Sequence, residues 1–375
     1  MPAVGREQST VTAERLDDGV VVLSFRVDGH RQNVITEGFL HDLAAALDTI
    51  DRGPQPRGLV LRSARDGSFF AGADIGRLEA VRAKPRPEIE RVCAAGRELY
   101  GRLASSPWPS VAIVDGVCLG GGLELALGCD LRIATDDPRT SLGFPEVKLG
   151  LLPGWGGTVR AARLIGPGLA VELVASGEPI DGASAACLGL VDACVPAAQA
   201  LESACRLIDS STDSRSYLDR RRRQAGAIDL DPREREFLEA TSSAVILGRT
   251  GGHYPAPLVI LETILTGCDK TAEEAGRIEG AAFAALATSD ISRELVRVFR
   301  LGERNRRDTG IGAAMADPAA DGEAEPERIE RPAVVGAGIM GAGIAASHLR
   351  AGFSVTLVDV QPETLAQSAE VREAL

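Results

Sequence analysis

The fold of this 375-residue chain is decided by residues 115–130, DGVCLGGGLELALGCD. This stretch follows the short strand-like run 110–114, passes three consecutive glycines and continues with the composition of a helix. A helix N-terminus presents unpaired N–H groups, and glycines allow the backbone to approach a ligand closely. The stretch therefore predicts a place where a developing oxyanion is stabilised, with Glu124 on the first helical turn beside it.

Strand and helix signals alternate on both sides of this stretch. β-Branched and leucine-rich runs at residues 20–25, 58–62, 110–114 and 131–135 predict short strands, and residues 41–50 repeat apolar side chains at helical spacing. Such alternation is typical of an α/β architecture. We expect a complete α/β core over residues 10–200.

The second half of the chain has a different character. Residues 201–308 are rich in alanine and leucine, and predict a helical extension with connecting helices over 240–247, 256–265 and 272–300. Residues 309–332 carry few large apolar side chains and predict a flexible linker. A new unit is expected over residues 333–375, so the length corresponds to one domain plus part of another.

Two further segments carry groups that could act with the glycine turn. Residues 69–75, FFAGADI, could supply a second backbone amide to the same oxygen. Residues 144–158, FPEVKLGLLPGWGGT, place Glu146 in an apolar, turn-rich setting, where desolvation raises the pKa of a carboxyl group. A glutamate in such a setting can hold and give a proton near neutral pH.

In order and spacing, the three segments resemble the enoyl-CoA hydratase/isomerase (crotonase) family, with its AGADI, GGGxEL and PExxLGxxPGxGGT motifs. The resemblance implies a crotonase (ClpP-like) spiral fold that binds a CoA thioester. It implies that the amides of Ala73 and Gly121 form an oxyanion hole for the thioester oxygen. Glu124 would activate the attacking water and Glu146 would exchange the proton at the α-carbon.

The same resemblance implies hydration of 2-enoyl-CoA to 3-hydroxyacyl-CoA in fatty-acid β-oxidation, with no cofactor required for that step. Two alternatives stay open: a Δ3,Δ2-enoyl-CoA isomerase, and a non-catalytic remnant that binds acyl-CoA. One position departs from the family, because Gly76 followed by Arg77 stands where many relatives have a lysine near the CoA phosphates.

A second glycine motif follows the predicted linker. Residues 332–341, PAVVGAGIMG, are a short strand running into Gly-x-Gly-x-x-Gly, followed by a helix, a second strand at 354–358 and Asp359. In this dinucleotide fingerprint Gly336 makes the tight turn, Gly338 admits the pyrophosphate and Gly341 permits close helix packing. Asp359 would accept the ribose hydroxyls, which favours NAD over NADP.

This segment resembles the start of the 3-hydroxyacyl-CoA dehydrogenase family, in which Met340 and Asp359 would fall at NAD contacts. Residues 252–257, GHYPAP, resemble the connecting region of the fatty-acid oxidation multifunctional enzyme. The family's catalytic histidine lies well beyond the second strand, and the chain ends at Leu375. We therefore expect an incomplete Rossmann β-α-β unit with an incomplete NAD site and no hydride transfer. The family also implies a thiolase subunit as a possible partner, and crotonase-type domains commonly self-associate.

Composition narrows the other possibilities. The chain has 41 Lys+Arg against 53 Asp+Glu, a net charge of −12, which disfavours binding to nucleic acid or an anionic membrane. No secretory leader or membrane-spanning run is recognised, so a cytoplasmic location is expected. Seven cysteines without a Cys-x-x-Cys pair and four scattered histidines predict neither a metal site nor a disulfide framework.

Three polar features have a structural and a functional interpretation. The run Arg220–Arg223 predicts a solvated helix face or turn, and the alternative is a site for the phosphates of an anionic ligand. His253 lies in a turn and His348 lies in the helix after the second glycine motif. For both histidines packing is favoured over catalysis.

Overall fold

The computed structural model describes residues 9–307 and 330–373, which fall in two units, Met1–Arg300 and Leu301–Leu375. The predicted flexible linker over 309–332 lies outside the described residues as far as residue 329. Each unit is described by itself.

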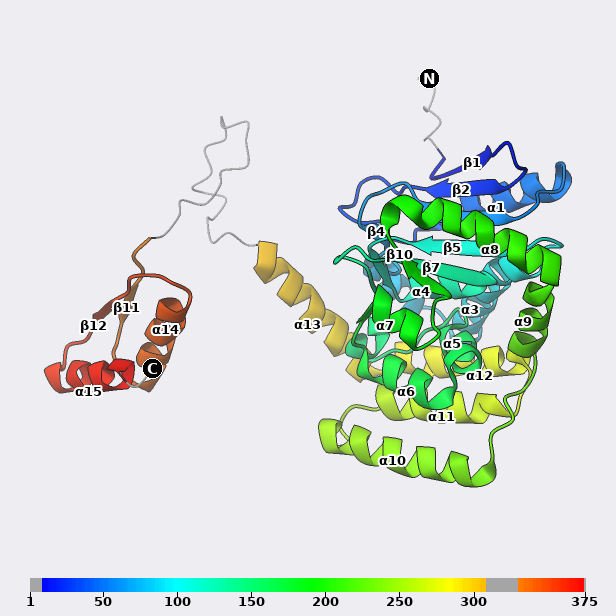
Figure 1. Cartoon of the computed structure of the whole chain (residues 1–375). Helices are drawn as coiled ribbons and strands as arrows, with labels where there is room; N and C mark the ends of the chain where they lie inside the picture. Colours follow the sequence, from blue (N-terminus) through cyan, green and yellow to red (C-terminus); the bar gives the residue numbers. More distant parts are fainter. Residues whose placement is uncertain (1–8, 308–329, 374–375) are drawn as a thin grey trace, which may run out of the picture. The chain divides into compact units, whose positions relative to one another are not determined.

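The first unit contains a six-stranded sheet in the order β1-β2-β3-β5-β7-β10 (Figure 1). Its first two strands are antiparallel, and every other neighbouring pair is parallel. The four predicted strands are confirmed as β2, β3, β5 and β7. The strands are β1 (Val11–Arg15), β2 (Val21–Phe25), β3 (Leu59–Ser63), β5 (Ser110–Val114), β7 (Leu131–Thr135) and β10 (Ala193–Val195).

A second, four-stranded sheet determines where the functional segments meet. Its order is β4 (Ser68–Phe70), β6 (Val117–Leu119), β8 (Ser141–Gly143) and β9 (Ile180–Asp181), and the first three strands run parallel. The carboxyl ends of parallel strands lie at the same edge of a sheet. The segments that follow β4, β6 and β8, which contain the three predicted motifs, are therefore brought together at one edge.

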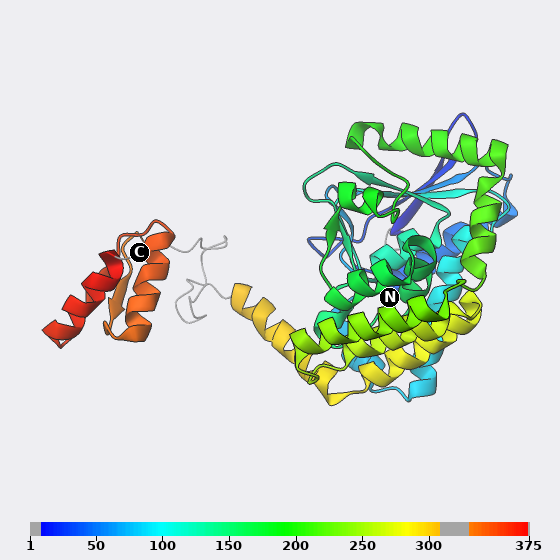
Figure 2. The same ribbon diagram turned by 60° about the horizontal axis from the view of Figure 1, so that its bottom comes forward.

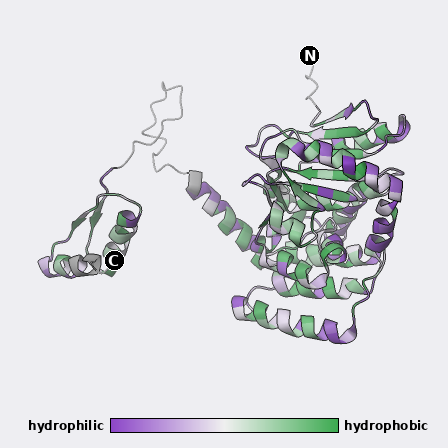
Figure 3. Ribbon diagram, in the orientation of Figure 1, coloured by the Kyte–Doolittle hydropathy of each residue, from purple (hydrophilic) through white to green (hydrophobic). Residues whose placement is uncertain are grey.

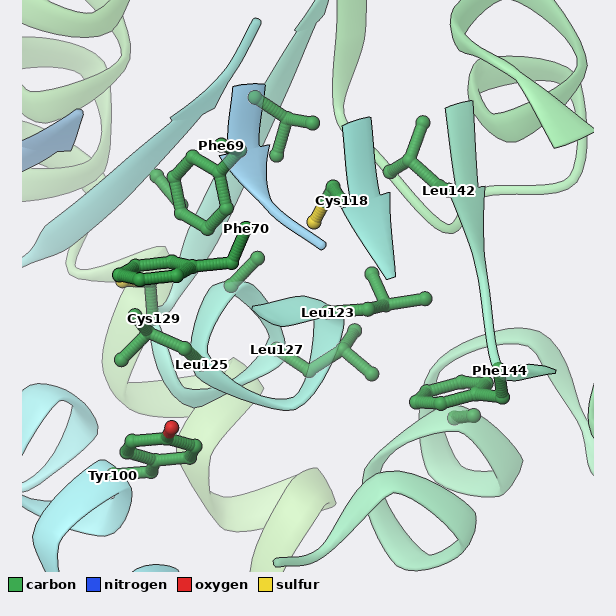
Figure 4. Packing of buried hydrophobic residues seen from close by; sticks show 14 of the residues in the cluster. Phe69, Phe70, Tyr100, Cys118, Leu123, Leu125, Leu127, Cys129, Leu142 and Phe144 are labelled. Carbon is green, nitrogen blue, oxygen red and sulfur yellow. The ribbon is translucent and has the colours of Figure 1, made fainter. Parts of the chain in front are cut away.

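Helix α4 (Gly121–Gly128) begins directly after β6 and is buried along all eight of its residues. A helix that is apolar on every side belongs in a core. Leu123, Leu125 and Leu127 project from α4 into the cluster that contains Phe69 and Phe70 (Figure 4). A Cβ on Gly122 would lie 2.5 Å from the Phe70 Cβ, so glycine is what lets α4 approach β4.

Amphipathic helices cover the sheets. Helix α1 (Glu37–Arg52) is capped by Thr36, whose side chain accepts a hydrogen bond from Phe39, and it buries a stripe at spacings of three and four residues. The predicted helix over 41–50 is thus confirmed as part of α1. The other helices up to residue 225 are α2 (Leu78–Arg82), α3 (Arg86–Gly101), α5 (Gly157–Ile165), α6 (Pro167–Ser176), α7 (Gly182–Cys187), α8 (Ala200–Ser214) and α9 (Ser216–Ala225).

Within the helical extension, helices α10 (Pro232–Thr250), α11 (Ala256–Cys268) and α12 (Ala272–Ala287) stack against one another (Figure 2). The predicted helical segment 272–300 is divided into two helices at Thr288 and Ser289, which the sequence interpretation did not foresee. Thr288 ends the first helix, and the Ser289 hydroxyl accepts the amide of Ser292 at the start of the second, 3.2 Å away. The four helices are α10 (Pro232–Thr250), α11 (Ala256–Cys268), α12 (Ala272–Ala287) and α13 (Asp290–Arg307).

The second unit is a β-α-β arrangement, as predicted. Strands β11 (Ala333–Val335) and β12 (Thr356–Val358) are parallel and are connected by α14 (Ile339–Arg350), and α15 (Pro362–Glu373) follows. Both strands are coloured as hydrophobic in Figure 3. Much of this apolar surface is open to solvent within the unit, since Val335 is 84% and Val358 45% exposed.

Candidate active site

The four residues predicted for catalysis line a single cavity. Ala73, Gly121, Glu124 and Glu146 border a space of about 260 Å³ in the first unit. The rest of its wall is mainly apolar, with side chains that suit a hydrocarbon chain: Ile35, Leu40, Leu78, Val81, Val92, Leu149, Leu152 and Phe283. A mostly apolar cavity with a few convergent polar groups is the usual form of a small-molecule site.

The backbone amides of Ala73 and Gly121, predicted to form an oxyanion hole, belong to two segments that border the cavity. Ala73 forms a parallel bridge with Ile35, in which Ile35 donates to the Gly72 carbonyl and Asp74 donates to the Ile35 carbonyl. Successive amides of an extended strand point to opposite sides, so the Ala73 N–H points away from Ile35. Gly121 is the first residue of α4, and the first amides of a helix have no partner within it.

Gly120 determines the backbone conformation immediately before α4. Its backbone has φ 53° and ψ −125°, a region that residues with a side chain rarely adopt. Its amide donates to the Gly143 carbonyl at the end of β8, 2.9 Å away, and its carbonyl accepts the amide of Glu124. A Cβ at this position would lie 2.5 Å from Oε1 of Glu146. Gly120 therefore joins the ends of two strands and leaves room for the Glu146 carboxyl group.

Glu124 is held by backbone donors although it is buried. Its Oε1 accepts hydrogen bonds from the amides of Trp155 at 2.6 Å and Gly157 at 2.8 Å, and its exposed fraction is 2%. Burial raises the pKa of Glu124 well above its ordinary value, the nearby charges of Glu279 and Glu146 add to that rise, and the two amides oppose it. The side chain is thus fixed in one orientation with Oε1 occupied.

Glu146 lies on the 3₁₀ helix η3 (Pro145–Leu149), which follows β8. Its Oε2 is buried and has no hydrogen-bond partner among the described residues. Burial raises the pKa of Glu146 to about 7, its own backbone amide opposes the rise, and the charge of Glu279 adds to it. This confirms the expectation that desolvation raises the pKa of this carboxyl group toward neutrality.

Sequence interpretation missed a third buried carboxylate. Glu279 of α12 is 0% exposed and accepts the amides of Gly156 and Thr158 and the Thr158 hydroxyl, at 2.6, 2.9 and 2.5 Å. The signal available in the sequence was a single acidic residue among alanines and glycines on the buried stripe of α12, next to Ala275 and Gly280. That pattern alone does not say which segment the carboxylate contacts.

The arginine run lies on α9, which is largely hydrophilic (Figure 3). Arg220 pairs with Asp192 at 2.6 Å, Arg221 pairs with Asp130 at 2.7 Å, and Arg222 pairs with Asp219. These ion pairs favour the structural interpretation of the run. Arg220 and Arg221 also border a second cavity of about 640 Å³. There both side chains are paired with carboxylates, and Arg221 also donates to the carbonyl oxygens of Ser106 and Trp108.

The second unit brings the predicted dinucleotide residues close to one another. Gly336 has φ 99°, Gly338 caps α14, and a Cβ on Gly341 would lie 1.7 Å from the Gly336 carbonyl oxygen. Oδ2 of Asp359 accepts the amide of Ala337 at 2.6 Å, so the acidic residue lies against the glycine turn. The Met340 side chain is 78% exposed at the start of α14. Their roles toward NAD stay a prediction.

Other groups considered in the sequence lie outside the cavity. His253 is exposed in the loop before α11 and is absent from the cavity wall, and His348 Nδ1 is 2.9 Å from the Ile344 carbonyl while its ring packs against Phe353. Within residues 9–307 and 330–373, no cluster of three or more His, Cys, Asp or Glu is suited to hold a metal ion. Over the same ranges, no helix combines the length and apolarity needed to cross a membrane.

Two family models match separate parts of the chain. Residues 16–224 match the family described as enoyl-CoA hydratase/isomerase, and residues 332–374 match the 3-hydroxyacyl-CoA dehydrogenase NAD binding domain. The fatty acid oxidation complex subunit alpha of Shewanella amazonensis is 33% identical over 362 residues, 96% of this chain and 49% of that protein. Its counterpart in Vibrio vulnificus is 33% identical over 94% of this chain and 48% of that protein. The chain thus spans about half the length of the curated relatives it matches.

Solved structures agree on the fold. A carnitinyl-CoA dehydratase from Mycobacterium thermoresistibile has a TM-score of 0.59 at 22% identity, covering 86% of this chain and all of that one. Human mitochondrial delta3-delta2-enoyl-CoA isomerase has a TM-score of 0.55 at 21% identity, covering 80% of this chain and 99% of that one. At such identities the likeness shows the fold alone. With the family match, it confirms the predicted crotonase-type fold.

Proposed function

Since the chain belongs to the enoyl-CoA hydratase/isomerase family, we propose that it adds water across the double bond of 2-enoyl-CoA to give 3-hydroxyacyl-CoA. The observation that carries this proposal is that two carboxyl groups, Glu124 and Glu146, and two amides, of Ala73 and Gly121, line one apolar cavity. Hydration needs a base, an acid and a site for negative charge on the thioester oxygen, and these groups supply all three.

The oxyanion hole acts first on the substrate. The thioester oxygen accepts hydrogen bonds from the amides of Ala73 and Gly121, and the start of α4 adds its partial positive charge. Negative charge develops on this oxygen when water adds at the β-carbon. Because the cavity wall is mainly apolar, the two amides act in a medium of low dielectric, where such bonds are stronger than in water.

The two carboxyl groups divide the proton transfers. Burial raises the pKa of Glu124, and the amides of Trp155 and Gly157 oppose that rise by stabilising the ionised form, which takes a proton from water as the water oxygen bonds to the β-carbon. Oε2 of Glu146 has no partner among the described residues and can carry a proton, which passes to the α-carbon as the enolate collapses. Each carboxyl group ends the step in the opposite protonation state, and transfer to and from solvent resets the pair.

The test is an assay of the purified chain with crotonyl-CoA, followed as loss of the absorbance of the conjugated thioester. We expect hydration by the wild type, and its loss in both Glu124→Gln and Glu146→Gln. A 3-enoyl-CoA substrate examines the isomerase alternative, which moves the double bond without consuming water. Binding of acyl-CoA with no turnover of either substrate would instead support the non-catalytic alternative and overturn the proposal.

The remaining assignments concern the longer relatives and stay predictions. A place in fatty-acid β-oxidation is supported by the relatives named fatty acid oxidation complex subunit alpha. NAD binding by Gly336, Gly338, Met340, Gly341 and Asp359 is supported by the matched NAD binding domain. A thiolase partner, self-association and a cytoplasmic location are predicted from the sequence and the family alone.

A further inference from the structure

We infer that Glu279, on α12 of the helical extension, is a positioning residue for Glu124 and acts through the segment Trp155–Thr158. This inference rests on the proposed hydration at the same site. Glu279 is absent from the wall of the cavity, and it shares no hydrogen bond with Glu124. Its effect on the position of Glu124 therefore passes through the backbone segment to which both carboxylates are bonded, and its charge acts separately on the pKa values of Glu124 and Glu146.

Four consecutive amides are divided between the two carboxylates. Trp155 and Gly157 donate to Oε1 of Glu124, at 2.6 and 2.8 Å. Gly156 and Thr158 donate to Glu279, at 2.6 and 2.9 Å. Alternation of this kind means that the segment cannot turn to satisfy one carboxylate better without withdrawing amides from the other. Glu279 therefore fixes the orientation in which Trp155 and Gly157 face Glu124.

Arg160 and Tyr100 also hold one end of the segment, since Arg160 donates to the Trp155 carbonyl at 2.7 Å and the Trp155 ring packs edge-on against Tyr100. Gly156 has φ 103°, a conformation in which glycine carries no steric penalty, and Gly157 is the first residue of α5, whose first amides have no partner within the helix. Thr158 strengthens the contact with its hydroxyl, which also donates to Glu279. Two glycines make the backbone of the segment adaptable, and the buried carboxylate of α12 is the group that binds the amides of Gly156 and Thr158.

The chemistry of the contact requires a carboxylate. Gly156 donates to Oε1 of Glu279, and the amide and hydroxyl of Thr158 donate to Oε2, so both oxygens act only as acceptors. A glutamine would have to point its NH₂ group at one of these N–H donors. The substitution Glu279→Gln therefore removes one side of the contact while it leaves side-chain volume almost unchanged.

Charged groups from several elements face Glu279. Arg97 of α3 and Arg160 and Arg163 of α5 are cationic, and Glu124 and Glu146 are acidic. The charge of Glu279 also raises the pKa of the Cys93 thiol of α3. Burial raises the pKa of Glu279, and its bonds to Thr158 and Gly156 together with Arg97 and Arg160 oppose the rise. Its negative charge in turn raises the pKa of Glu146, so removal of that charge lowers the pKa of Glu146.

The experiment compares wild type, Glu279→Gln and the control Glu274→Gln in the full chain. Glu274 lies on the same helix, is exposed and serves the capping box with Thr271, so its loss perturbs α12 without reaching the cavity. Each variant is measured for kcat and KM with crotonyl-CoA and for stoichiometric binding of butyryl-CoA, which cannot be hydrated. The pH profile of hydration is recorded for each.

For Glu279→Gln we expect full butyryl-CoA stoichiometry, KM within about threefold of wild type and kcat lower by about 10–100-fold, since small misplacement of a catalytic group has effects of this size. The alkaline limb of the profile, where Glu146 loses its proton, should move to lower pH. Glu274→Gln should change neither kcat nor the profile. A wild-type kcat and profile in Glu279→Gln at full stoichiometry would overturn the inference.

If Glu279→Gln does not fold, Thr158→Val takes its place, because it removes one of the donors to Glu279 and keeps the carboxylate. A smaller fall in kcat at unchanged butyryl-CoA binding is expected, and an unchanged kcat would contradict the inference. Failure of the proposed function has a separate signature, which is the absence of crotonyl-CoA hydration in the wild type itself.

Discussion

The chain contains two strand–glycine–helix turns that look alike in sequence and differ in their surroundings. In the first, β6 leads through Gly120 into α4, whose eight residues are all buried. In the second, β11 leads through Gly336 and Gly338 into α14, where Ile339 is 95% exposed. One turn is built into a core, and the other is open within its own unit.

The two turns differ at the glycines that precede their helices, Gly120 and Gly338, whereas Gly341 of the second turn is also required by a neighbour, the Gly336 carbonyl. A Cβ on Gly120 would meet the Glu146 carboxyl group and a Cβ on Gly122 would meet Phe70, so those glycines are required by neighbours already present in the chain. A Cβ on Gly338 would meet nothing within 4 Å. The open space beside Gly338 would let a ligand approach the start of α14, as the predicted NAD site requires.

The largest contrast is expected between the carboxylates that accompany the two turns. Glu124→Gln should lower crotonyl-CoA hydration by about 10²–10⁴-fold, the usual contribution of a general base. Asp359→Asn should leave hydration at the wild-type rate, because the hydrogen bonds described for Asp359 are with backbone amides of the second unit, such as those of Ala337 and Gln361. Steady-state kinetics on both variants measures this contrast, and a loss of hydration in Asp359→Asn as large as that in Glu124→Gln would contradict it.

The second-largest contrast is expected between Gly120 and Gly338, the glycines that precede α4 and α14. Gly120→Ala forces a side chain into a strained backbone region and against Glu146, so we expect it to lower the free energy of unfolding by about 1–3 kcal/mol and to impair hydration. Gly338→Ala should change neither quantity for the first unit. Denaturant unfolding with the hydration assay measures both, and equal stability of the two variants would contradict the steric explanation.

Glycines inside the two helices give a smaller contrast of opposite sign. Gly122→Ala overpacks α4 against Phe70 and should destabilise by about 1–3 kcal/mol, part of which is offset by better helix propensity. Gly343→Ala lies in α14 with nothing within 4 Å of the added methyl, and should stabilise that helix by up to about 1 kcal/mol. Thermal unfolding of both variants tests the pair. A stabilised Gly122→Ala would show that α4 can move away from β4.

The smallest effect concerns pH. The pKa of Glu146 is raised to about 7, whereas amides of Ala337 and Gln361 lower the pKa of Asp359. Because Glu146 must be protonated to serve the α-carbon, kcat/KM should fall as pH rises through about 7, and Asp359→Asn should keep the same profile. If the residual activity of Glu146→Gln kept the same alkaline limb, that limb would belong to another group.

The same raised pKa affects stability. Glu146 binds its proton more tightly in the folded chain than at the ordinary value of 4.5, so its contribution to stability is fully present below that value. It declines as pH rises from there to about 7 and is constant above. Denaturant unfolding of wild type and Glu146→Gln at several pH values measures the difference, and identical slopes against pH would contradict it.

Sequence interpretation succeeded where a pattern extends over several residues. The strands β2, β3, β5 and β7 and helix α1 follow from their apolar spacing, and the three motifs placed Glu124 and Glu146 in one cavity. It did not predict β4, β6 or β8, which are three residues long and show no periodicity. Yet these strands bring the motifs together.

Glu279 was missed for a different reason. Its contacts with Gly156 and Thr158 join segments more than a hundred residues apart in the chain, and nothing local in α12 specifies them. The sequence predicts residues 201–308 only as a helical extension with connecting helices and assigns this extension no contact with the site. In the structure the Tyr254 hydroxyl of this extension accepts the Gly150 amide and Ser292 donates to the Leu149 carbonyl, so the extension holds the C-terminal end of η3, the short helix on which Glu146 lies.

The most direct test of the central claim, that this cavity adds water across a 2-enoyl thioester, is product analysis of crotonyl-CoA incubated with the chain in D₂O. The proposed roles of Glu124 and Glu146 predict 3-hydroxybutyryl-CoA with the hydroxyl on the β-carbon and one deuterium on the α-carbon, seen by NMR and mass spectrometry. Recovery of crotonyl-CoA with its double bond intact and no deuterium would contradict the account.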